Sequence, residues 1–209
     1  MKAHISIIDQ HRLAGLQDGV YSIAMTLLVL ELKLPALPEP LTDALLWSAL
    51  VSIWPKLLTW LLSFWVLAKY WIGDVRALAS FNTVNGILLR LSLTRLALVS
   101  LLPFSTALIG EHGSHIAGAA IYAGHLFLIA AALVTRHTYL LLHPDIVTWP
   151  NPEAASEATV QTWGNMVCCA AALGLAFLSP GYNMLALVPM LFAGFLYKIW
   201  PRRAARTAD

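Results

Sequence analysis

The sequence predicts an all-α membrane protein that crosses the bilayer several times. Of its 209 residues, 59% are hydrophobic and only 11% are charged, and the mean hydropathy is +0.71. Soluble domains carry about 25% charged residues, so a soluble fold of this composition would expose too much apolar surface. This excludes a soluble enzyme domain, a disordered tail and a nucleic-acid binder. The net charge of +2 is too small to indicate an acidic partner.

Six apolar stretches are long enough to be membrane helices. A helix that crosses the hydrocarbon core needs about 20 mostly apolar residues. We therefore expect helices over residues 13–34, 43–70, 84–109, 116–142, 159–178 and 182–200. Together they form one domain over residues 1–209, and no internal repeat at half the length divides the chain.

The breaks between these stretches are polar or contain proline. Pro35 ends the first helix, and Pro55 lies inside the second, where it predicts a kink because proline cannot donate a backbone hydrogen bond. The other breaks are the segments at residues 73–82, 111–115, 143–157 and 179–181. Glu111, His112 and His115 are possible metal ligands. A solvated loop is the expected interpretation, however, and we predict no metal site and no cofactor.

Lysine and arginine are distributed unevenly between the two sides of this arrangement. One side carries Lys33 alone, and the other carries nine: Lys2, Arg12, Lys69, Arg76, Arg136, Lys198, Arg202, Arg203 and Arg206. Cytoplasmic loops are enriched in these residues, so both termini are expected in the cytoplasm. The chain is then a multi-pass protein of the cell membrane. We expect this membrane to be the inner membrane of a bacterium. The C-terminal arginines of the chain should contact anionic lipid head groups.

The first helix carries two patterns. Ile23, Leu27 and Leu30 fall at i, i+4 and i+7 and so share one face. Gly15 and Gly19 form a small-xxx-small pair, which permits close helix packing. An aliphatic stripe usually faces lipid or a protein core, but rings of such side chains around an axis also gate pores by dewetting. The pattern alone leaves both interpretations open.

Several charged residues lie inside the apolar stretches, where an unpaired charge is costly. Asp18 and Arg90 are at similar depths from the cytoplasmic side, so we expect them to pair and to hold the first helix in place; Arg95 and Arg12 are alternative partners. Lys56 lies in the middle of the second stretch with no obvious carboxylate at its depth. It is either a proton-coupling group of a transporter or a structural residue, satisfied by carbonyl groups that the kink frees or by a cleft between protein chains.

Residues of the first helix resemble the signature of a known family. The transmembrane protein 175 family, the lysosomal potassium channels and their prokaryotic relatives, opens its first helix with Arg-x-x-x-Phe-Ser-Asp-Gly. Arg12, Asp18 and Gly19 match this signature, while Leu16 and Gln17 replace its Phe and Ser. Further similar segments are residues 23–30, Pro55-Lys56, Ser63-Phe64, Tyr70-Trp71 and 101–111. The chain departs from the family after Tyr-Trp, where residues 73–75 replace a His pair.

The resemblance implies a potassium-selective channel with one six-helix unit per chain, assembled as a homotetramer around a pore lined by the first helix. Carried over by position, Ile23, Leu27 and Leu30 would form the constriction, and Thr26 a polar layer beside it. The structural signature would consist of Arg12, Asp18 and Gly19, with Arg90 as the partner of Asp18. The Thr-Val-Gly-Tyr-Gly filter of other potassium channels is absent from this sequence, as it is from the family.

Two other functions stay open. A small proton-coupled secondary transporter would use Lys56 or Asp18 as its titrating group. A membrane assembly factor is the third hypothesis, although no recruiting loop or soluble domain is visible in the sequence. A channel passes ions down either gradient without a pH gradient, whereas a coupled carrier saturates and moves charge together with protons.

Overall fold

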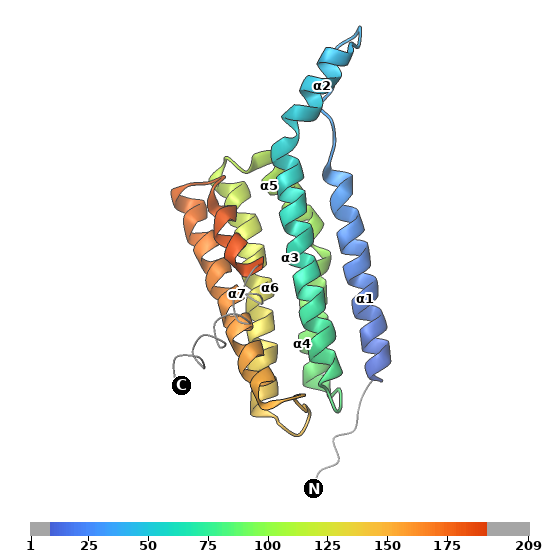
Figure 1. Ribbon diagram of the computed structural model, residues 1–209, viewed down its shortest axis with the longest axis vertical. Helices are drawn as coiled ribbons and strands as arrows, with labels where there is room; N and C mark the ends of the chain where they lie inside the picture. The colour runs from blue at the N-terminus through green and yellow to red at the C-terminus, as the bar shows by residue number, and fades with distance from the viewer. Residues whose placement is uncertain (1–8, 192–209) are drawn as a thin grey trace, which may run out of the picture.

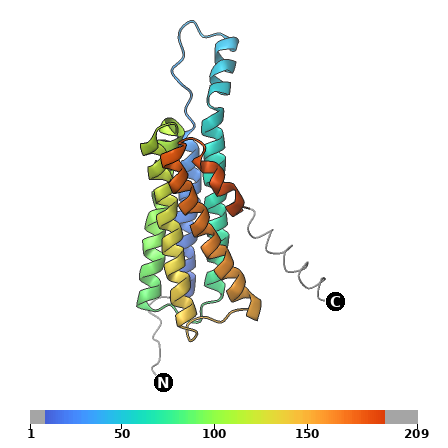
Figure 2. The same ribbon diagram turned by 90° about the vertical axis from the view of Figure 1, so that its left-hand side faces the viewer.

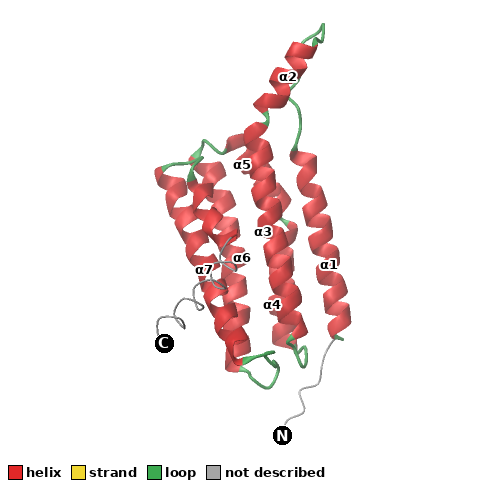
Figure 3. Ribbon diagram, viewed as in Figure 1, coloured by secondary structure: helices red, strands yellow, loops and turns green. Residues whose placement is uncertain are grey.

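The computed structural model describes residues 9–191, which fold as a bundle of helices (Figures 1 and 3). Within this range the only strand-like pairing is one isolated bridge between Phe81 and Val147, so the all-α prediction is confirmed. The helices, with η marking a 3-10 helix, are α1 (Gln10–Leu27), η1 (Leu28–Glu31), α2 (Asp43–Ser52), α3 (Trp54–Ala79), α4 (Gly86–Ser100), α5 (Leu102–His112), α6 (Ile116–Leu142), α7 (Pro152–Leu178) and η2 (Asn183–Leu187).

Polar side chains and prolines set where the helices begin. In α1, α2, α4 and α7 a capping side chain accepts a hydrogen bond from a backbone N–H of the first turn, a donor that the helix itself cannot satisfy. These caps are Asp9, Thr42, Asn85 and Asn151. Pro55 and Pro103 lie in the first turns of α3 and α5, where a missing N–H costs little. The kink predicted at Pro55 is confirmed, because α2 and α3 meet at a bend of 43°.

The predicted helix ranges hold where an apolar run is uninterrupted. Residues 116–142 form α6 as predicted, and α1 with η1 covers most of the predicted helix 13–34. The polar link predicted from Gly73 onward was wrong, because α3 continues through it to Ala79. Asp74 in this segment is not solvated but buried against basic side chains, so it does not interrupt the helix.

Four helical segments of the described chain are long and apolar enough to cross a membrane, and the bent pair of α2 and α3 is a fifth candidate. The four are Gln10–Glu31, Gly86–His112, Ile116–Leu142 and Glu153–Leu178. The last begins several residues before the predicted start at residue 159. Of the predicted sixth helix, 182–200, the structure describes η2 and the first turn beyond it. Residues 192–200 lie outside the described part, as do residues 1–8 and the C-terminal arginines.

The helices form an elongated bundle in which α1 lies at one edge (Figure 1). α1 packs against α3 and α4, and α6 packs along α7. α2 projects beyond the end of the bundle in both views (Figures 1 and 2). Between the helices, one apolar core takes side chains from α1, α3, α4, α5, α6 and α7, among which are Tyr21, Leu67, Leu96, Ile109, Leu126 and Cys169.

Two of the cations counted on the cytoplasmic side, Lys69 and Arg136, make polar contacts inside the bundle. Lys69 in α3 donates to Asn165 Oδ1 at 2.6 Å and to the backbone carbonyl of Met190. Arg136 in α6 is buried and paired with a carboxylate. Arg76 is exposed in the last turn of α3 and keeps its place at the end of the bundle where α1 begins. Lys69 and Arg136 therefore serve packing, and they do not count toward the loop charges that indicate topology.

Candidate functional site

α1 has one face in the bundle and one face that the described chain leaves uncovered. The side chains of the buried face are at most 3% exposed and are Leu13, Gln17, Tyr21 and Ala24 of α1 and, in the η1 turn that follows it, Leu28. Ile23, Leu27 and Leu30 are 60%, 40% and 60% exposed. The stripe predicted from their spacing is therefore an open apolar surface of the single chain, available to lipid or to other copies of α1.

Small and polar residues also lie outside the buried face of α1, among them Gly15, Gly19 and Thr26. The Thr26 hydroxyl donates to backbone carbonyls of the preceding turn, at 3.0 Å from Ser22 O and 2.9 Å from Ile23 O, which leaves its oxygen free to accept. A Cβ placed on Gly15 or Gly19 would meet no atom within 4 Å. The close packing predicted from these glycines thus does not occur within the described chain. Arg12 is exposed near the start of the same helix.

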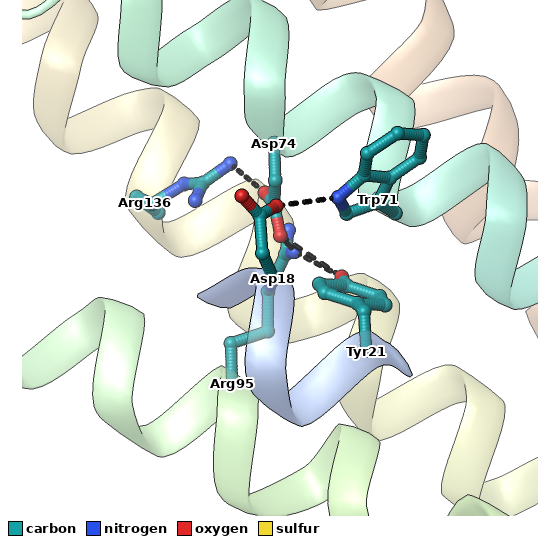
Figure 4. A network of polar contacts seen from close by, with 6 residues as sticks. All are labelled: Asp18, Tyr21, Trp71, Asp74, Arg95 and Arg136. Carbon is teal, nitrogen blue, oxygen red and sulfur yellow. Dashed lines mark hydrogen bonds and ion pairs between the residues drawn. The ribbon is translucent and has the colours of Figure 1, made fainter. Parts of the chain in front are cut away.

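Asp18 is not paired with Arg90, so that prediction was wrong. Asp18 Oδ1 accepts a hydrogen bond from Trp71 Nε1 of α3 at 2.7 Å (Figure 4). Arg90 is exposed, and its Nε donates to the carbonyl oxygen of Gly86 on its own helix at 3.1 Å. The pair was predicted because Asp18 and Arg90 lie at similar depths in the membrane. The rotation of α4 about its axis, however, points Arg90 away from Asp18. Asp18 ties α1 to α3 through an indole donor.

A buried ion cluster joins α1 to three other helices (Figure 4). Asp74 of α3 accepts from Arg136 of α6 through one carboxylate oxygen, at 2.7 Å. Its other oxygen is paired with Arg95 of α4 and accepts from the Tyr21 hydroxyl of α1 at 2.9 Å. Arg95 also donates to the Tyr21 oxygen. These four residues are at most 3% exposed, so four helices meet at one carboxylate that is shielded from solvent.

The cluster acts as an anchor for α1. A buried charge that loses its partner is strongly destabilising, so the carboxylate and the guanidinium groups hold their helices at a defined rotation. Tyr21 precedes Ile23 by two residues, and fixing the Tyr21 hydroxyl in the bundle directs Ile23 outward. Over the described residues, no group of three or more His, Cys, Asp or Glu could hold a metal ion.

One feature of the sequence points to this cluster, although the predicted site residues do not include it. A charged residue inside a membrane helix needs a partner, and Arg95 lies within a predicted helix. Asp74 was assigned to a polar link because Gly73 and Arg76 flank it. Arg136 was counted with the loop charges because it lies near the end of a predicted helix. Matching the unpaired Arg95 with an acidic residue would have selected Asp74 as a candidate beside Asp18.

Lys56 lies in the first turn of α3 rather than in the middle of a helix. Its Nζ is 3.7 Å from Glu111 Oε1. The expectation that no carboxylate lies near it was wrong, because α5 packs against α3 and ends beside its start. The side chains are 29% and 54% exposed, so the pair is a loose surface contact. Lys56 and Glu111 line a small cavity together with Glu31 and Trp60.

Part of the chain is similar to known potassium channels. Residues 12–103 match the family model described as the endosomal/lysosomal potassium channel TMEM175. The chain is 34% identical over 130 residues to a potassium channel of Streptomyces collinus, with 60% of each protein covered. It is 36% identical over 135 residues to a potassium channel of Chamaesiphon minutus, with 60% of this chain and 62% of that protein covered. The chain thus spans about three fifths of the length of these curated relatives.

The fold is similar to a solved structure over almost the whole chain. That protein is described as a lysosomal potassium-selective channel TMEM175 homolog from Chamaesiphon minutus. The TM-score is 0.72 and the sequence identity 26%, with 91% of this chain and 96% of that chain covered. The resemblance drawn from the first-helix residues is confirmed. The matched family is one of ion channels, not of enzymes, and with the apolar helices it confirms a multi-pass membrane protein.

Proposed function

We propose that the chain, whose residues 12–103 match the TMEM175 family model, is one subunit of a potassium-selective cation channel. Potassium ions move passively through a central pore that the first helix of each of four subunits lines. The observation that carries this proposal is the division of α1 into an anchored face and an open apolar face. Four copies placed around an axis would bring the open faces together and remove them from lipid.

The proposed subunit is one domain over residues 1–209 with six membrane helices and both termini in the cytoplasm. The four candidate spans and the bent pair of α2 and α3 supply five of the helices, and residues 182–200 supply the sixth. Exposed Arg12 and Arg76 lie at the same end of the bundle, which supports a cytoplasmic location of that end. The chain then functions in a bacterial inner membrane, surrounded by lipid and without a cofactor other than the conducted ion.

Ile23, Leu27 and Leu30 form the proposed constriction, with Thr26 as a polar layer beside it. The three apolar layers extend over roughly 10 Å of helix, at about 1.5 Å per residue. Hydrocarbon side chains cannot replace the water shell of an ion, so an ion must give up part of its shell without compensation. Potassium holds its shell less strongly than sodium, and the constriction therefore favours potassium. The same layers would close the pore by dewetting.

A flux assay on the purified chain in liposomes tests the proposal. With a potassium or a sodium gradient and no pH gradient, potassium flux should exceed sodium flux. Ile23→Asn should bring the ratio of potassium to sodium permeability toward one, because an amide in the constriction supplies ligands that the hydrocarbon lacks. Val29→Asn is the matched control: Val29 is 48% exposed but points roughly a third of a turn away from Ile23 around the helix.

Two results would contradict this assignment. If the potassium-to-sodium permeability ratio is unchanged in Ile23→Asn, the constriction does not lie at Ile23. Flux that appears only when a pH gradient is imposed would favour the proton-coupled transporter, for which Lys56 and Asp18 are the groups to change next. Equal effects of the Ile23 and Val29 variants would indicate a general disturbance of α1.

A further inference from the structure

The open face of α1 continues beyond the proposed constriction toward the start of the helix. Leu16 is 45% exposed and precedes Ile23 by seven residues. Seven residues are close to two full helical turns, so Leu16 and Ile23 point in nearly the same direction, roughly 10 Å apart along the axis. Any axis that Ile23 faces is therefore an axis that Leu16 faces as well.

Between these two apolar side chains the face carries Gly19 on one flank and Val20 on the other, and Val20 is half-buried against the apolar core of the bundle. Gly19 lies midway, and a Cβ built there would meet no atom within 4 Å. Ser22, which immediately precedes Ile23 and points about 100° away from it, is also exposed. A face directed toward lipid would gain from large apolar side chains at such positions. Glycine and serine are better suited to a face that borders water.

From these observations we infer that Leu16 forms a second apolar ring on the cytoplasmic side of the constriction, separated from the Ile23 ring by a wider, hydrated chamber around Gly19. The inference rests on the proposed function, since rings require copies of α1 around a common axis. An apolar ring excludes water from its own layer, whereas the chamber keeps room for a monovalent cation with its water shell. An ion entering from the cytoplasm would then meet two barriers in series.

The two rings have different tasks in this arrangement. The layers at Ile23, Leu27 and Leu30 form a continuous constriction and set selectivity. Leu16 is a single layer that an ion crosses between two hydrated regions, so it should limit the rate of conduction without setting the preference for potassium. This difference allows the Leu16 ring to be tested apart from the constriction.

Single-channel recording on the full chain in planar bilayers tests the ring. Leu16→Ser should raise potassium conductance by roughly threefold to tenfold, since a tenfold change corresponds to about 1.4 kcal/mol of barrier, while the potassium-to-sodium permeability ratio stays at the wild-type value. Leu93→Ser is the matched control. Leu93 is 41% exposed on α4, at a similar distance from the same end of the bundle, and its replacement should leave conductance unchanged.

A second pair of variants tests the chamber. Gly19→Leu should lower potassium conductance by at least about tenfold, because four leucines would fill the space between the rings. Gly73→Leu is its control, since Gly73 of α3 is exposed and its Cβ would likewise meet nothing within 4 Å. Both leucines have space in the single chain, and size-exclusion chromatography of each variant checks the assembly.

The outcomes separate this inference from the proposed function. If Ile23→Asn loses selectivity while Leu16→Ser and Gly19→Leu behave like their controls, the second ring and the chamber are refuted and the channel stands. If Leu16→Ser also abolishes selectivity, Leu16 belongs to the selective constriction, and the separation of the two rings is refuted. If the wild-type chain passes no potassium, both the proposed function and this inference fail.

Discussion

Replacing Asp74 by asparagine should destabilise the protein more than any other single polar substitution in the bundle. The change keeps the size of the side chain and removes one charge. It leaves the guanidinium groups of Arg95 and Arg136 in a site where neither residue is more than 3% exposed, without the carboxylate that both now contact. Breaking a buried ion pair by removing one partner costs about 3–5 kcal/mol. We expect a loss of unfolding free energy in that range.

Asp18→Asn is the control for this experiment. Asp18 is exposed, and its contact with Trp71 Nε1 needs only an acceptor oxygen, which asparagine also provides. The variant loses the extra strength of a hydrogen bond to a charged group, about 1 kcal/mol. The chemical change is the same in both variants. The difference between their losses of unfolding free energy therefore gives the contribution of the burial of Asp74 and of its pairing with two arginines.

A double variant tests the electrostatic origin of the effect. Arg136→Gln in the Asp74→Asn background removes one of the two uncompensated charges. The double variant should be more stable than the sum of the single effects predicts, with a coupling energy of about 1–3 kcal/mol, as found for residues in one network. A coupling near zero would show that Asp74 stabilises the bundle through packing alone.

Unfolding in a denaturing detergent, followed by tryptophan fluorescence of the purified protein, gives these free energies. The eight tryptophans of the chain provide the signal. The reasoning is refuted if Asp74→Asn lies within about 1 kcal/mol of the wild type, or if it costs no more than Asp18→Asn, since a buried charge without its partner should cost several times that amount.

Two further substitutions separate surface from buried polar contacts. Glu111→Gln should change stability by less than about 1 kcal/mol, and less still in high salt, because its 3.7 Å contact with Lys56 is partly exposed; a larger loss in the same unfolding assay would indicate a second role for Glu111. Tyr122→Phe should cost about 1–2 kcal/mol, because it removes a buried hydroxyl that lies 2.9 Å from Ser63 Oγ. If the Tyr122→Phe variant shows no shift of the unfolding midpoint, water replaces the lost hydroxyl as the partner of Ser63 Oγ.

How far the fold could be predicted depends on what interrupts the apolar runs. Residues 116–142 were predicted to the residue because the run between His115 and His143 contains no proline and its one arginine lies near the end. α3 was predicted to stop too early, because polar residues normally mark the end of a membrane helix and here one of them is buried. The break before Pro103 was missed, although proline in a run favours a new helix start.

The candidate site was predicted in part. The common direction of Ile23, Leu27 and Leu30 follows from helical periodicity, and the structure leaves these side chains uncovered. The partner of Asp18 was predicted from depth alone and was wrong, because two residues at one depth pair only if both helices turn them toward each other. Rotation of α4 about its own axis depends on its packing against α1 and α6, which no local pattern encodes.

The sequence by itself determined that this protein is a helical membrane protein with a first helix similar to that of the TMEM175 family, and which side chains share a face of that helix. Composition, run length and helical spacing are local properties, so they can be computed from neighbouring residues. Only the tertiary structure decided that Asp74 joins Arg95, Arg136 and Tyr21, and that this cluster fixes the rotation of α1. Charges far apart in the chain meet at one point only after packing has set the rotation and the relative height of four helices.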